Sequence, residues 1–112
     1  MEPKNEIKSL LEEILRFRNE RDWEKFHDAK NLAINLSVES SELLEAFLWK
    51  NNEEVDLDKV KEELADVLYS AFLLADKYDL NISQIIRDKL KKNALKYPVS
   101  KSKGSKKKYN EL

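Results

Sequence analysis

The sequence predicts an all-α protein with the architecture of a four-helix bundle. Four segments carry apolar residues at three- and four-residue spacing, which is the period of an amphipathic helix. The 112 residues include 1 Gly and 2 Pro, too few for the many turns of a β-rich fold. Short polar segments separate the four apolar patterns, so consecutive helices are expected to be antiparallel neighbours.

The first helix is predicted over about residues 4–20, and the second from Asp28, as its N-cap, to about Lys50. A polar break leads from one to the other. The apolar face of the first helix is formed by Ile7, Leu10, Leu11, Ile14 and Phe17. The corresponding face of the second is formed by Leu32, Leu36, Leu43, Ala46 and Phe47.

A third helix is predicted from Asp58, as its N-cap, to about Lys77, and a fourth from Asn81 or Ser83 to Pro98. Several of the apolar faces are wider than one small bundle needs to cover its core. A bundle of this length also buries only a modest core. The sequence therefore favours a homo-oligomer.

Composition excludes several classes of function. Without Cys, the chain has no disulfide, thiol nucleophile or cysteine-based zinc site, which suits a reducing compartment. A single Gly excludes the Gly-rich loops that bind phosphate groups. No apolar run approaches the roughly 18 residues of a membrane span, and acidic residues near the start argue against a signal peptide. We therefore expect a cytoplasmic protein without a membrane partner.

The net charge of −1 is unevenly distributed along the chain. Residues 99–112 hold five Lys against Glu111, a local charge of +4, so residues 1–98 carry −5. This division predicts a helical domain over residues 1–98 and a basic tail over residues 99–112. The tail is either a solvated terminus or an arm that meets an anion. Because the acidic domain repels phosphate, no nucleic-acid polymer is expected as a partner.

Four acidic residues interrupt the apolar faces of the second and third helices. Glu39 and Glu42 are three residues apart, as are Glu63 and Asp66, so each pair shares a helix face. If residues 51–57 form the turn, the pairs lie at similar heights, because each helical residue rises about 1.5 Å. Four converging carboxylates without His or Cys suit Mg²⁺ or Mn²⁺. Solvated charged helix faces would produce the same spacing.

The acidic motif belongs to a longer pattern. Glu39-x-x-Glu42 and Glu63-x-x-Asp66 resemble the E-x-x-E…E-x-x-D signature of the all-α MazG-like nucleotide pyrophosphohydrolases. The segments RDWEKFH (21–27), LWK (48–50) and KYP (96–98) resemble the dCTP pyrophosphatase branch of that family. The resemblance implies a MazG-type protomer in a dimer or dimer of dimers. It also implies Mg²⁺-dependent hydrolysis of dCTP or a related pyrimidine nucleoside triphosphate to monophosphate and pyrophosphate, a reaction of nucleotide-pool sanitation.

The resemblance further implies which residues bind the nucleoside. Trp23 and Trp49 would flank the pyrimidine, since base–aromatic stacking contributes about 1–3 kcal/mol per base. His27 would contact the substrate, and Asn31 would bind a base edge or sugar, or cap its helix. Ordinary packing would also account for both tryptophans.

The phosphate groups would meet Lys89, Asn93, Lys96 and Tyr97, which match the family's K-x-x-x-N-x-x-[RK]-Y element. A solvated helix face would carry the same residues. The chain departs from the dCTP-hydrolysing pattern at one place. Ser70 stands four residues after Asp66, where those relatives have a tyrosine near the sugar, and the tyrosine of this chain is Tyr69. The preference for deoxyribose over ribose is therefore left open.

Two other classes of protein fit parts of the sequence. A di-metal oxidase bundle would need Glu-x-x-His pairs, and Glu24 with His27 is a single such spacing outside the four central acids. A non-enzymatic helical interaction or nucleotide-binding module would account for the apolar faces and the charge. It would not account for the matched acid pairs and the two tryptophans, so the sequence favours the enzyme.

Overall fold

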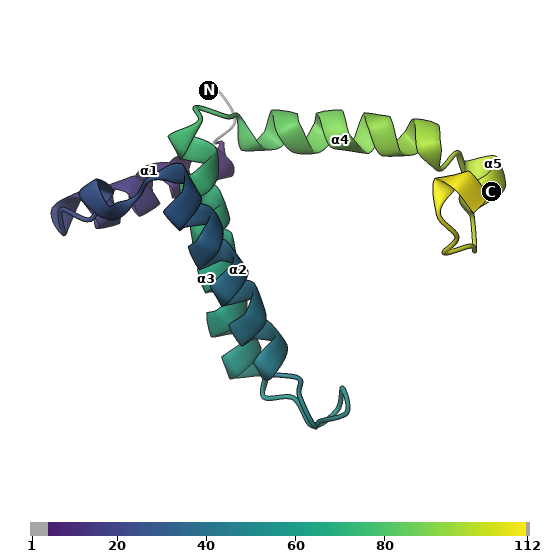
Figure 1. The fold of residues 1–112 in the computed structure, drawn as a ribbon, viewed down its shortest axis with the longest axis horizontal. Coiled ribbons are helices and arrows are strands. Elements are labelled where there is room, and N and C mark those ends of the chain that lie inside the picture. Colours follow the sequence, from purple (N-terminus) through teal and green to yellow (C-terminus); the bar gives the residue numbers. More distant parts are fainter. Residues whose placement is uncertain (1–4, 112) are drawn as a thin grey trace. The chain divides into compact units, whose positions relative to one another are not determined.

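The computed structural model describes residues 5–111, and this part of the chain is entirely helical (Figure 1). The first predicted helix was expected to begin at residue 4, which lies outside the described residues. The elements are α1 (Glu6–Glu20), η1 (Glu24–Phe26, a 3₁₀ turn), α2 (Ala29–Glu45), α3 (Leu57–Lys77), α4 (Ile82–Lys96), α5 (Val99–Ser102) and η2 (Tyr109–Glu111, a second 3₁₀ turn).

Side chains cap the N-termini of the four longer helices, where backbone N–H groups have no partner within the helix. The Oδ1 atoms of Asn5, Asp28 and Asn81 accept hydrogen bonds that begin α1, α2 and α4. The prediction of Asp28 as a cap is confirmed, and of the two predicted starts of the fourth helix, Asn81 and Ser83, the structure has Asn81. The prediction of Asp58 is wrong: Asp56 caps α3 by accepting from the Asp58 N–H at 3.0 Å. Asp58 lies in the first turn, where its negative charge meets the positive end of the helix dipole.

The second helix is shorter than its apolar pattern predicts. It ends at Glu45, not near Lys50, because the chain tightens into turns in which the N–H of Ala46 donates to the carbonyl of Leu43. Trp49 then adopts φ +63°, a left-handed conformation that is rare for a bulky side chain. The apolar run from Ala46 to Trp49 therefore belongs to the connection and not to the helix.

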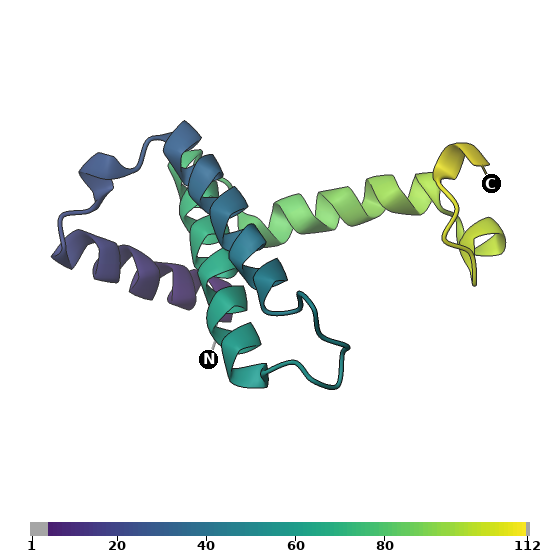
Figure 2. The ribbon, with the colours of Figure 1, turned by 60° about the horizontal axis from the view of Figure 1, so that its bottom comes forward.

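The chain divides into two compact units at residues 80 and 81, which the structure describes over residues 5–80 and 81–111. In the first, α2 and α3 run antiparallel side by side, and α1 packs against α3 (Figures 1 and 2). Leu32 on α2 and Leu73 on α3 are the most buried of its hydrophobic side chains, each 2% exposed. The second unit contains α4, α5 and η2.

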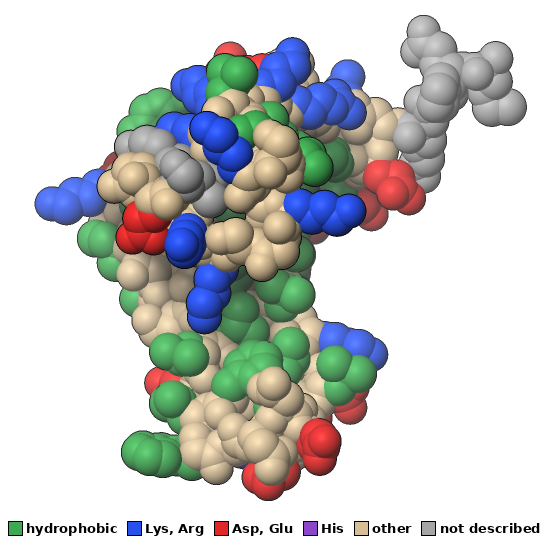
Figure 3. All heavy atoms as spheres, turned by 90° about the vertical axis from the view of Figure 1, so that its right-hand side faces the viewer, with side chains coloured by type: hydrophobic (Ala, Val, Ile, Leu, Met, Phe, Trp, Pro, Cys, Tyr) green, Lys and Arg blue, Asp and Glu red, His purple; other side chains and the backbone are tan. Residues whose placement is uncertain are grey.

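Most of the large hydrophobic side chains remain at the surface of the isolated chain. Within the described residues, the buried hydrophobic side chains are Leu32, Ala46, Leu73 and Ala75. Figure 3 shows hydrophobic side chains on the surface of the hairpin, where Leu44, Leu48 and Leu57 are exposed. Such a surface is consistent with the oligomer that the sequence favours, which stays a prediction.

Among residues 5–111, no helix combines the length and the apolar character needed to cross a bilayer.

Candidate functional site

Three of the four predicted acidic residues converge within the α2–α3 hairpin. Glu39 of α2 and Glu63 and Asp66 of α3 each offer one carboxylate oxygen, and these three oxygens lie within 4.8 Å of one another. The antiparallel pairing of α2 and α3 produces this convergence, as the matched spacing predicts. Glu63 is buried, Glu39 is half-buried and Asp66 is exposed, so the triad opens from the helix interface toward the surface.

The electrostatics of the triad are unfavourable without a cation. Burial raises the pKa of the Glu39 carboxyl, and a side-chain hydrogen bond with Glu42 and the charges of Glu42, Asp66 and Glu63 raise it further. The Oε2 atoms of Glu39 and Glu63 are buried without a hydrogen-bond partner. Because a buried carboxylate oxygen without a partner is costly, and because hard divalent cations prefer oxygen ligands, the two Oε2 atoms and the exposed Asp66 fit such a cation.

Glu42 lies outside this triad. Its half-buried side chain acts on Glu39 through the hydrogen bond and through its charge. Three residues correspond to about 300° around a helix, so Glu42 is turned by about 60° from Glu39. Glu63 and Asp66 have the same offset and both belong to the triad, so helix geometry alone does not decide which carboxylates meet.

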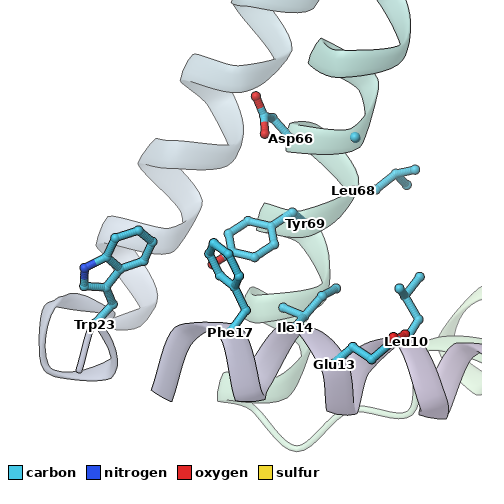
Figure 4. A pocket seen from close by; sticks show the side chains of 9 residues that line it. Leu10, Glu13, Ile14, Phe17, Trp23, Asp66, Leu68 and Tyr69 are labelled. Atoms are coloured by element: carbon cyan, nitrogen blue, oxygen red, sulfur yellow. The ribbon is translucent and has the colours of Figure 1, made fainter. Parts of the chain in front are cut away.

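A largely apolar cavity of about 690 Å³ adjoins the triad (Figure 4). Asp66 belongs to the triad and also lines the cavity. The walls of the cavity come from α1, from the segment before η1 and from α3. They are formed by Leu10, Glu13, Ile14, Phe17, Trp23, Ala65, Asp66, Leu68 and Tyr69. The Phe17 ring packs edge-on against Trp23 at 5.8 Å and against Tyr69 at 6.3 Å between centroids. Ring edges and faces of this kind are suited to a flat aromatic ligand.

Phe17 and Tyr69 are cavity residues that the sequence reasoning did not assign. Burial raises the pKa of the Tyr69 hydroxyl, whose buried oxygen has no hydrogen-bond partner. Tyr69 follows Asp66 by three residues, so it stands one turn further along nearly the same face of α3. That spacing is the signal that could have found it. Ser70 is buried and is not among the residues that line the cavity.

The two tryptophans do not meet within one chain. Trp23 lines the cavity beside the start of α2, whereas Trp49 follows the end of α2 and is 99% exposed. Between them lie the 17 residues of α2, about 25 Å at 1.5 Å per residue. The left-handed backbone of Trp49 stores strain at a residue that is almost fully exposed.

His27 lies in a cluster of charged residues apart from the triad. Burial lowers its pKa, as do the positive charges of Arg18 and Lys77, and Glu24 opposes this effect. Arg18 is 8% exposed and pairs at 3.7 Å with both Glu24 and Asp76, so it ties α1 to η1 and α3. The side chain of Asn31 donates to the Asp28 carboxylate at 3.2 Å, which supports its interpretation as part of the helix cap.

The family model for the MazG-like family matches residues 34–112, well over half of the chain. The chain belongs to the MazG-like family. It is 38% identical over 114 residues to dCTP pyrophosphatase 1 of Mus musculus, with 91% of this chain and 67% of the mouse protein covered. Identity to the Homo sapiens dCTP pyrophosphatase 1 is 35% with the same coverage. A crystal structure of a pyrophosphatase from Archaeoglobus fulgidus superposes with a TM-score of 0.82 at 36% identity, covering 88% of this chain and 97% of that one.

These similarities confirm the predicted all-α fold class and the resemblance to MazG-like nucleotide pyrophosphohydrolases. The model match of this MazG-like chain includes the acidic triad and all of the second unit. In that unit Lys89, Asn93 and Lys96 follow one another along α4, and Tyr97 caps its C-terminus by donating its N–H to the Asn93 carbonyl at 2.7 Å. Lys89 and Lys96 are exposed, and Asn93 is half-buried. In Figure 3, Lys and Arg side chains gather over this unit.

Proposed function

We propose that this MazG-like chain is a nucleotide pyrophosphohydrolase that cleaves dCTP, or a related pyrimidine nucleoside triphosphate, between the α and β phosphates. The observation that carries the proposal is the acidic triad joined through Asp66 to an aromatic-lined cavity. A triphosphate needs a site that holds its charged end, and a nucleobase needs flat apolar walls. The similarity to dCTP pyrophosphatase 1 proteins supports the choice of nucleotide.

Glu39, Glu63 and Asp66 would hold Mg²⁺, or Mn²⁺ in its place. A divalent cation bound there supplies neutralisation of phosphate charge and a lower pKa for a bound water. The unpartnered oxygens of Glu39 and Glu63 support this assignment. Glu42 adjoins the triad without belonging to it, so its carboxylate is left to orient the attacking water and accept its proton.

The nucleoside would occupy the cavity with its base against Trp23 and Phe17. Tyr69 would offer its unpartnered hydroxyl to the base or sugar. Since Trp49 cannot reach the same base within one chain, we assign it to the base site of a second copy in a dimer or dimer of dimers. In this assignment Trp49 is covered by the partner, which accounts for its exposure in the single chain.

By the family resemblance, Lys89, Asn93, Lys96 and Tyr97 would contact the phosphates, and His27 would contact the substrate as a neutral imidazole. The basic tail, residues 99–112, would close over the triphosphate as an addition to a catalytic domain of residues 1–98. Its five lysines give a polyanion several partners.

A panel of nucleotides tests this function. The purified protein is incubated with pyrimidine and purine nucleoside triphosphates, in deoxy and ribo forms, with Mg²⁺ or with EDTA. Pyrophosphate and phosphate are measured separately. We expect pyrophosphate from dCTP with Mg²⁺ and none with EDTA. Phosphate in place of pyrophosphate, or purine turnover as fast as that of dCTP, would contradict the assignment. Nucleotide binding without turnover would favour the non-enzymatic module.

A further inference from the structure

Lys59 contacts the buried member of the acidic triad. Its Nζ lies 2.7 Å from Oε1 of Glu63, one helical turn later on α3. The Lys59 side chain is 52% exposed, whereas that of Glu63 is 10% exposed. Among the ion pairs of the described residues, this is the pair that includes a triad carboxylate.

Helix stabilisation alone does not explain this pair. A Lys four residues before a Glu is the less favourable order for an isolated helix, because both charges oppose the helix dipole. An exposed ion pair also contributes little to stability. The burial of Glu63 supplies the reason for the contact, since a buried carboxylate requires a compensating charge.

We propose that Lys59 is the resident counter-ion of the metal-free site and competes with the divalent cation for Glu63. In the structure its ammonium group compensates one oxygen of Glu63, while the other oxygen has no hydrogen-bond partner. When a divalent cation binds, the ammonium group leaves Glu63 for solvent, which its exposed, flexible four-carbon chain allows. Lys59 thus stabilises the metal-free fold and weakens metal binding. The inference rests on the proposed metal site.

The size of the effect follows from charge. Removing one positive charge in contact with a ligating carboxylate strengthens the attraction for a divalent cation by a factor on the order of ten, when both groups are near the surface. Lys61, another exposed lysine of α3, provides a matched control. Two residues correspond to about 200° around the helix, so Lys61 lies away from the face of Lys59 and Glu63.

The test compares wild type with Lys59→Met, which removes the charge, Lys59→Gln, which keeps a hydrogen-bond donor, and Lys61→Met. Mg²⁺ alone and Mn²⁺ alone are titrated calorimetrically, and melting temperatures are measured in EDTA and at saturating Mg²⁺. We expect both Lys59 variants to bind either metal about tenfold more tightly than wild type. Their melting temperature should be lower in EDTA, and its rise with Mg²⁺ larger. Lys61→Met should match wild type.

Two results would overturn the inference. If both Lys59 variants bind metal as wild type does, or more weakly, Lys59 does not compete, although the proposed metal site stands. If neither wild type nor any variant binds Mg²⁺ or Mn²⁺, the metal site fails and the role of Lys59 fails with it. Circular dichroism at the titration temperature verifies that each variant is folded.

Discussion

Replacing Glu39 by Gln should stabilise the metal-free protein. Glu39 presents a carboxylate oxygen within 4.8 Å of one on Glu63 and one on Asp66. Two like unit charges at that separation repel by about 0.9 kcal/mol in bulk water and about 3.5 kcal/mol at an effective dielectric constant of 20. Lys59 offsets the charge of Glu63, and solvent screens the exposed Asp66. We therefore expect a net gain of about 1–2 kcal/mol in the free energy of unfolding.

For a domain of this size, such a gain corresponds to a rise of roughly 4–10 °C in melting temperature. Thermal melts in EDTA measure it, with Glu62→Gln, an exposed neighbour of the triad, as the control. At saturating Mg²⁺ the order should reverse, because only wild type retains the full set of ligands and gains stability from binding. A fall of several degrees for Glu39→Gln in EDTA would refute the reasoning, since it would mean that Glu39 is structurally paired.

The same variant tests how the free energy of unfolding of the metal-free protein changes with pH. Because the pKa of Glu39 is raised in the folded protein, the folded state holds this proton more tightly than the unfolded state. The stability that results is present below the ordinary pKa of 4.5 and is lost as the pH rises through the raised value. Denaturant titrations in EDTA should therefore show wild type losing more stability than Glu39→Gln as the pH rises above 4.5.

Three further predictions concern the residues around the triad. Trp49→Gly should raise the KM for dCTP about tenfold or more through lost stacking. Its melting temperature should stay near that of wild type, because glycine relieves the strain of φ +63°; an unchanged KM would assign Trp49 to packing alone. His27→Gln should lose less stability than wild type as the pH falls below 6.5, because the lowered pKa of His27 favours its neutral form in the folded state. If wild type and His27→Gln lose the same free energy of unfolding between about pH 7.5 and pH 5 in denaturant titrations, that interpretation is wrong. Deleting residues 101–112 should raise the KM and make it less salt-sensitive without changing the oligomeric state, whereas wild-type kinetics would indicate a solvated terminus.

Local spacing predicted the parts of the site that depend on helix geometry. The rise per residue is fixed, so residues equally far from a connection lie at similar heights on an antiparallel hairpin. The connection is residues 46–56 and not the expected 51–57, and Glu39 and Glu63 each lie six residues from the helix end that adjoins it. Glu39, Glu63 and Asp66 accordingly meet. Glu42 shows the limit of this reasoning, because sharing a face to within 60° does not fix where a long side chain ends. The predicted end of α2 near Lys50 was wrong, because the apolar residues after Glu45 continue the helical spacing although they lie in turns.

Other features depend on partners that lie far apart in the sequence. Phe17 was expected on the core face of the first helix, yet it is 43% exposed and lines the cavity, while the adjacent Arg18 is buried. Arg18 is compensated by Glu24 and by Asp76, and the contact with Asp76 exists only because α1 packs against α3. An apolar period cannot reveal such a pair. Trp23 and Trp49 are separated because α2 lies between them. The family resemblance assigned both to one base and did not predict this separation.

The most direct test of the account compares Glu63→Gln with Glu62→Gln. The substitutions are identical, adjacent on α3 and matched in charge, but Glu63 is buried in the triad and Glu62 is exposed outside it. The measurement is the rate of pyrophosphate release from dCTP at saturating Mg²⁺. We predict a loss of orders of magnitude for Glu63→Gln and a rate near that of wild type for Glu62→Gln. Comparable rates for the two folded variants would contradict the claim that the triad carries the reaction.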